Sequence, residues 1–102
     1  DEDCIKTSDL LISINDSLPE PYFYAGMAYI NMALDMEKKG STTKSVKNKL
    51  KELYDKACPY MEKYRTIAPD DKDKWAPALY RIYLNLNMGR KFEEIDKMLN
   101  EK

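Results

Sequence analysis

The sequence contains no histidine, which removes the commonest catalytic base and the commonest ligand of transition metals. Its two cysteines, Cys4 and Cys58, are too far apart for a paired metal motif, and we expect two buried thiols in preference to a disulfide. Phosphate-binding glycine loops, nucleophile elbows and calcium-loop patterns are also missing. We therefore predict a protein that is not an enzyme, with no catalytic residues, no metal and no cofactor.

Long apolar runs and an excess of one charge are missing as well. No run approaches the roughly 20 apolar residues of a membrane-spanning helix. The 102 residues include 17 Lys and Arg against 18 Asp and Glu, a net charge of −1. We therefore predict no membrane insertion and no nucleic-acid binding, in at most one domain. Because the sequence starts with Asp1 and not Met, we expect it to be a segment of a longer protein.

Apolar residues recur at three- and four-residue spacing throughout, which predicts an all-α fold of about five helices. Gly40 and Pro69 separate consecutive helices, and Ser41, Thr42 and Thr43 offer caps for the helix that follows Gly40. Pro59 falls inside that long helix, where we expect a kink and not a break. The predicted apolar faces span residues 4–15, 22–36, 46–67, 75–86 and 92–99.

Seven residues follow the spacing W-x2-L-G-x2-Y, then A-x3-F, then P: Tyr22, Ala25, Gly26, Tyr29, Ala57, Met61 and Pro69. With these motifs the chain resembles the C-terminal repeat region of bacterial tetratricopeptide repeat (TPR) proteins. More residues separate its two halves than in the standard 34-residue unit, so we expect elongated helices. In the next hairpin Leu79 and Tyr83 keep the spacing, whereas Tyr80 replaces the glycine.

The resemblance implies a single TPR-like domain over residues 1–102, with antiparallel helix hairpins stacked as a short right-handed α-solenoid. Residues 1–15 then form the second helix of a preceding repeat, 16–69 an elongated repeat and 70–102 a terminal capping repeat. The resemblance also implies that Gly26 lies where the two helices of a hairpin approach most closely. Many such bacterial proteins are exported, which points to the cell envelope or periplasm.

In TPR stacks the first helix of each hairpin lines a groove. The resemblance places six residues there: Phe23, Met27, Ile30, Asn31, Arg81 and Leu84. We therefore predict a non-catalytic scaffold that binds a protein or peptide. Phe23 and Met27 stand where members that clamp a terminal carboxylate carry Lys and Asn, so that ligand class is not expected. Two alternatives stay open: a structural cap or self-association element, and a glycan or small-molecule site built on aromatic rings.

Eight tyrosines and a run of lysines between residues 38 and 56 offer further candidate sites. Tyr22, Tyr29, Tyr64 and Tyr83 lie on the apolar helix faces, where we expect them to pack in the core. The lysines are interspersed with carboxylates at helical spacing, which is typical of a solvated surface.

Overall fold

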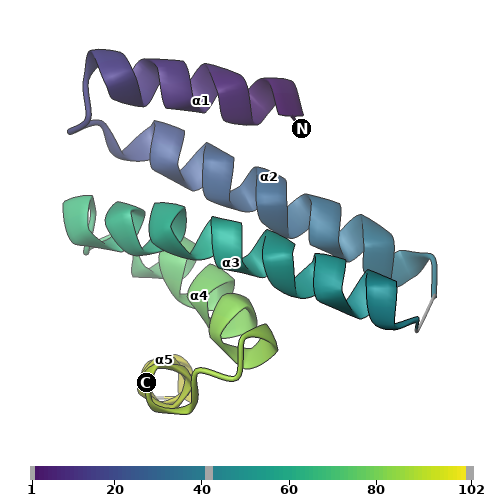
Figure 1. The fold of residues 1–102 in the computed structure, drawn as a ribbon. Coiled ribbons are helices and arrows are strands. Elements are labelled where there is room, and N and C mark those ends of the chain that lie inside the picture. Colours follow the sequence, from purple (N-terminus) through teal and green to yellow (C-terminus); the bar gives the residue numbers. More distant parts are fainter. Residues whose placement is uncertain (1, 41–42, 101–102) are drawn as a thin grey trace.

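The computed structural model describes residues 2–40 and 43–100, and every secondary-structure element in these two ranges is an α-helix (Figure 1). The prediction of an all-α fold with about five helices is therefore confirmed. The helices are α1 Glu2–Ile14, α2 Pro19–Lys38, α3 Lys44–Ile67, α4 Lys72–Asn85 and α5 Gly89–Asn100. None of these described helices is long and apolar enough to cross a membrane.

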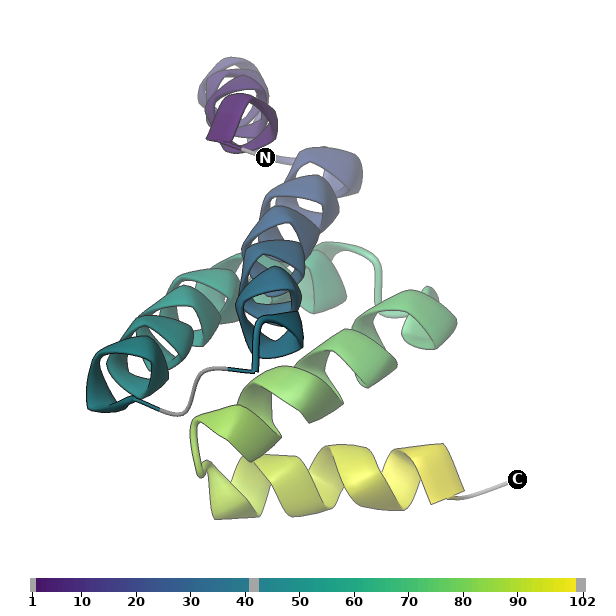
Figure 2. The ribbon, with the colours of Figure 1, turned by 90° about the vertical axis from the view of Figure 1, so that its right-hand side faces the viewer.

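Each helix packs against the next one along the chain, and α2 also contacts α4. Figures 1 and 2 show α1, α2 and α3 lying in order, with α4 crossing α3 and α5 following α4. The dimensions are 39 × 37 × 18 Å. The smallest of these is about two helix diameters. The slab is thin enough that most helices keep one side toward solvent.

The ends of α2 follow from its turn residues. Pro19 opens the helix, at a position where a backbone N–H has no helical partner to lose. Gly40 follows α2 with φ +71°, a conformation that costs glycine little. The next helix begins after Thr43, whose hydroxyl accepts a hydrogen bond from the Val46 amide at 3.3 Å. The other predicted caps, Ser41 and Thr42, lie outside the described residues.

The core lies mainly among α2, α3 and α4. Its largest fully buried side chains are Tyr54, Met61, Leu79, Ile82 and Ile95. Of the residues assigned to helix packing, Tyr29 is half-buried and Pro69 is exposed in the turn before α4. The others are buried: Tyr22, Ala25, Gly26, Ala57, Met61, Leu79 and Tyr83.

The two cysteines have different environments. Both are free thiols, with Cys58 buried in α3 and Cys4 exposed on α1. The expectation of two buried thiols is therefore wrong for Cys4. The reason is that α1 buries a narrow stripe through Ile5 and Ser8, and Cys4 lies beside that stripe.

Candidate functional site

A groove of about 360 Å³ lies between α2 and α4, and we call it the α2–α4 groove. This volume falls within the range of about 300 to 1,000 Å³ that is common for ligand sites. One wall is entirely apolar, whereas the other carries charged side chains at its edge. The α2 wall consists of Phe23, Met27, Ile30 and Leu34, and the α4 wall of Asp73, Lys74, Pro77, Ala78 and Arg81.

Four of the six predicted groove residues come together in the α2–α4 groove: Phe23, Met27, Ile30 and Arg81. Ile30 forms its floor, since it is only 2% exposed and packs in the core. Asn31 and Leu84 are exposed but do not line this groove. One step along a helix turns a side chain by about 100°, so Asn31 points away from the wall that Ile30 builds. Leu84 lines a separate recess beside Gly89 and Phe92.

Two cations lie along the edge of the α2–α4 groove. The Lys74 Nζ atom lies 6.0 Å from the ring centroid of Phe23, within reach of a cation–π contact. The Arg81 Nη1 atom lies 3.9 Å from Oε2 of Glu37. Because the Arg81 side chain is 46% exposed, this ion pair contributes little and leaves the guanidinium accessible to a ligand.

Contacts with the end of α3 fix the start of α4 and hence the position of Lys74. The Tyr64 hydroxyl donates to Oδ2 of Asp71 at 2.7 Å, and burial together with this bond raises the pKa of Tyr64. The Trp75 indole N–H donates to the Pro69 carbonyl at 3.1 Å, while the Arg65 guanidinium lies 4.5 Å from the Trp75 ring. The α4 wall is thus held before a ligand binds, which limits the entropy cost of binding.

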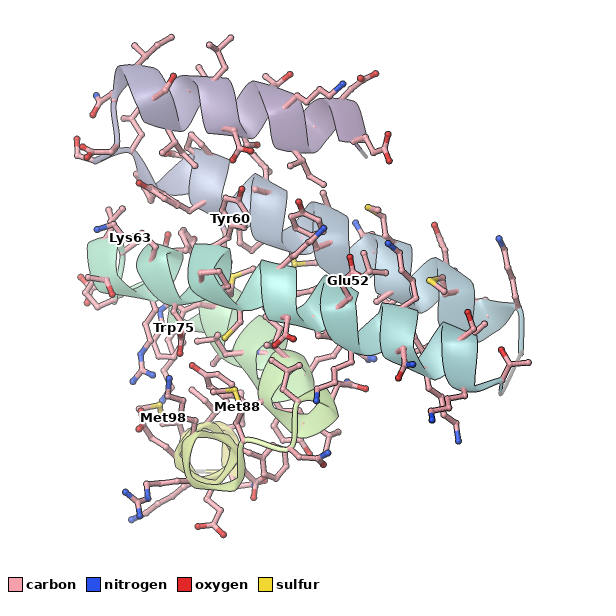
Figure 3. The ribbon with its side chains drawn as sticks, in the orientation of Figure 1. Glu52, Tyr60, Lys63, Trp75, Met88 and Met98 are labelled. Carbon is pink, nitrogen blue, oxygen red and sulfur yellow. The ribbon has the colours of Figure 1, made fainter. Side chains whose placement is uncertain are left out.

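A second and larger groove, of about 640 Å³, lies on another side of α2. We call it the tyrosine groove, and it is lined by Tyr22 and Tyr29 from α2 and by Asp55, Lys56, Pro59, Tyr60 and Lys63 from α3. Figure 3 shows Tyr60 and Lys63 on the side of α3 that faces α1, with Trp75 on the opposite side beside α4. Tyr29 and Lys56 also line an adjoining recess of about 230 Å³ that reaches Ile5 on α1.

Contacts among α1, α2 and α3 hold the rings of Tyr29 and Tyr60 in the tyrosine groove. The rings of Tyr29 and Tyr60 stack with centroids 6.0 Å apart. The Tyr60 hydroxyl donates to Oδ1 of Asp9 on α1 at 2.6 Å. Burial and this hydrogen bond raise the pKa of Tyr60 above its ordinary value of 10.0.

The tyrosine groove was not predicted, although the sequence carries a signal for it. Residues 55–63, DKACPYMEK, and residues 73–81, DKWAPALYR, share Asp, Lys, Pro and a basic residue at positions 1, 2, 5 and 9. In each segment the residues at positions 1, 2, 5, 6 and 9 line a groove against α2. We call these segments the DKxxP segments. The two grooves therefore have equivalent walls.

The proline of each DKxxP segment removes one backbone hydrogen bond from its helix. Proline has no N–H, so Pro59 and Pro77 withhold the helical hydrogen bond from the carbonyls of Asp55 and Asp73. Both of these aspartates line the grooves. Each groove thus offers apolar surface and two cations.

In the part of the chain that the structure describes, no three Asp, Glu or Cys side chains gather as metal ligands. No protein-family model, curated protein or solved structure matches this chain, so the interpretation of both grooves depends on their own geometry.

Proposed function

We propose that the chain is a non-catalytic interaction module that binds a protein segment in the α2–α4 groove. The observation that carries the proposal is the meeting of Phe23 and Met27 with Lys74 and Arg81 across one groove. Apolar side chains of the partner displace water from Phe23 and Met27, and the two cations at the edge select among partners by charge.

A TPR-like architecture is part of this proposal. The packing of each helix on the next and the place of Gly26 against α3 support a short right-handed α-solenoid. In this interpretation α1 is the second helix of a preceding repeat, residues 16–69 form an elongated repeat and residues 70–102 a capping repeat. Such a stack keeps its binding surface rigid, because every helix is fixed by its neighbours.

The proposal is tested with a displayed library of random peptides selected on the purified chain. The readout is the affinity of the selected peptides for the F23A/M27A double variant. Covering one apolar anchor contributes about 1.5 to 3 kcal/mol, so we expect affinity to fall at least about tenfold. A library without binders, or peptides that bind the double variant equally well, would contradict this function.

The chain provides a matched control for this test. Asn31 and Leu84 are exposed, lie on the same helices and do not line the groove. The N31A/L84A double variant should therefore bind the selected peptides as the unaltered chain does. Circular dichroism melting of all three proteins separates a loss of binding from a loss of folding.

Self-association is the second candidate function, and exposed apolar side chains near the end of α1 favour it. Leu10, Ile14 and Leu18 are 61%, 74% and 43% exposed. Such a cluster is typical of a surface that a second copy covers. Light scattering across a concentration series tests this alternative: a mass that doubles with concentration, and returns to that of a monomer in L10S/I14S, supports it. A constant monomer mass contradicts it.

A further inference from the structure

The walls that the DKxxP segments present to the two grooves carry the same charges in the same order. In the tyrosine groove Asp55, Lys56 and Lys63 face the ligand space, and their equivalents in the α2–α4 groove are Asp73, Lys74 and Arg81. The α2 residues that line the two grooves are uncharged, and Glu37 of α2 pairs with Arg81 from outside the lining. Each groove lining thus has one positive charge in excess, and it is placed by α3 or α4 alone.

The spacing of the cations defines which ligand charges fit. Lys56 and Lys63 are seven residues apart, which is two helical turns or about 10 Å along α3. Pro59 and Tyr60 lie between them and give the middle of the wall an apolar surface. A complementary segment therefore has two carboxylates about 10 Å apart with apolar side chains between them. In a helical partner, this corresponds to acidic residues seven positions apart on one face.

From this equivalence we infer that the tyrosine groove is a second binding site for the class of protein segment that occupies the α2–α4 groove. The segment is amphipathic, with acidic residues seven positions apart on its apolar face. This inference rests on the proposed function, because the α2–α4 groove provides the reference site. One chain then holds two such segments on different sides of α2, or two parts of one partner.

The contacts around the tyrosine groove are compatible with binding. Its rings are fixed by the Tyr29–Tyr60 stack and by the hydrogen bond from Tyr60 to Asp9, so little order has to be created when a ligand binds. Lys56 has one ion pair, 3.4 Å to Glu52, and both side chains are about half exposed. Exchanging so exposed a pair for a ligand carboxylate costs little.

The experiment titrates the full chain with a synthetic amphipathic helix by isothermal calorimetry. The peptide has two Glu residues seven positions apart, with Leu at the third and fourth positions after the first Glu. We expect two peptides to bind each chain. In Lys63→Glu and in Arg81→Glu, which change the same position of the two DKxxP segments, we expect one peptide to bind, and none in the double variant.

The outcomes separate this inference from the proposed function. If Arg81→Glu abolishes binding while Lys63→Glu leaves stoichiometry and affinity unchanged, the tyrosine groove is not a site and the α2–α4 groove remains one. If the peptide does not bind at all, the inferred acidic ligand class is wrong. The library selection then still tests whether the α2–α4 groove binds a protein segment. A glycan that binds at the tyrosines while this peptide does not would also overturn the inference.

Two controls keep the experiment decisive. Lys47→Glu makes the same charge change at an exposed position of α3 that lines neither groove, and it should bind two peptides. An equal loss of peptide binding in Lys47→Glu would mean that the peptide is held by general attraction between charges. That result would overturn the assignment of the two sites to the grooves. If a Glu variant melts early, Lys63→Gln and Arg81→Gln replace the pair, and each should weaken one of the two sites.

Discussion

A Cβ atom at Gly26 would lie 2.9 Å from Cε of Met61 and 3.6 Å from the Met61 amide nitrogen. The atom nearest to this position is therefore the end of the flexible Met61 side chain and not the backbone of α3. Met61 is fully buried, so its methyl group has little room to move. Gly26 is tolerated inside α2 because this contact leaves almost no space for a side chain.

We predict that Gly26→Ala changes the free energy of unfolding by less than about 1 kcal/mol, because the gain in helix propensity offsets the displacement of Met61. Gly26→Val should destabilise the fold by about 2 kcal/mol or more, since its branched side chain meets the α3 backbone as well. Urea denaturation measures both changes. Equal stability of the Val variant and the unaltered chain would show that the helices are not in close contact here.

Acid should weaken a network centred on Glu62. This carboxylate accepts hydrogen bonds from the Tyr83 hydroxyl at 2.5 Å and from Lys91 Nζ at 2.9 Å. Burial by itself would raise the pKa of Glu62, but these bonds outweigh it and lower the pKa below its ordinary value of 4.5. A lowered pKa in the folded state means that the stabilisation is present above about pH 4.5 and is lost as the pH falls through the folded-state pKa.

We therefore expect Glu62→Gln to reduce the free energy of unfolding at pH 7 by about 1 kcal/mol, a modest value because the side chain is 35% exposed. The difference from the unaltered chain should narrow below pH 4.5, where the native carboxylate is progressively protonated. Urea denaturation at neutral and acidic pH measures it, with Glu93→Gln on the exposed side of α5 as the control. A difference independent of pH would contradict this account.

The two thiols should react at very different rates. Burial, aided by the nearby Glu62 carboxylate, raises the pKa of Cys58 to about 11, so almost no thiolate is present at pH 8. Cys4 is exposed. Ellman's reagent should modify one thiol per chain rapidly in the native protein and the second only in urea. Cys4→Ser should remove the rapid phase, and its persistence would show that Cys58 is accessible.

Helical periodicity was enough to predict the all-α fold, because each helix buries one continuous stripe. It was not enough to predict the details of α2, since this helix is covered by three others, α1, α3 and α4. Which apolar residues of α2 stay accessible depends on where α4 crosses. For this reason Phe23 and Met27 remain partly exposed while Ile30, with the same apolar character, is buried.

The tyrosine groove depends on how α1 lies relative to α3, and no local pattern in the sequence encodes that distance. The Tyr60 hydroxyl reaches Asp9 across 51 residues of chain, a contact that residue spacing within one helix cannot predict. The exposure of Cys4 has the same origin, because it depends on how far α1 is covered. The DKxxP segments are visible in the sequence, but only the structure shows that both line grooves.

Pro59 and Pro77 line the grooves, and they should also lower the stability of the fold. An interior proline costs a helix about 3 kcal/mol relative to alanine, and its restriction of the unfolded chain returns up to about 1 kcal/mol. We therefore expect Pro59→Ala, at an exposed position of α3, to raise the free energy of unfolding by about 1 to 2 kcal/mol. Pro19→Ala, at the start of α2, should change it by less than about 0.5 kcal/mol, since no helical hydrogen bond is gained there.

Pro59→Ala should also weaken peptide binding at the tyrosine groove, because it removes the apolar ring between Lys56 and Lys63. Pro77→Ala should do the same at the α2–α4 groove, where the proline ring lies between Lys74 and Arg81. Urea denaturation and peptide titration of each variant measure the two effects separately. A variant that is more stable and binds less tightly at its own groove is the result expected if the prolines are kept for binding. A Pro59→Ala chain that gains stability and binds two peptides with unchanged affinity would show that the proline has no part in the tyrosine groove's function.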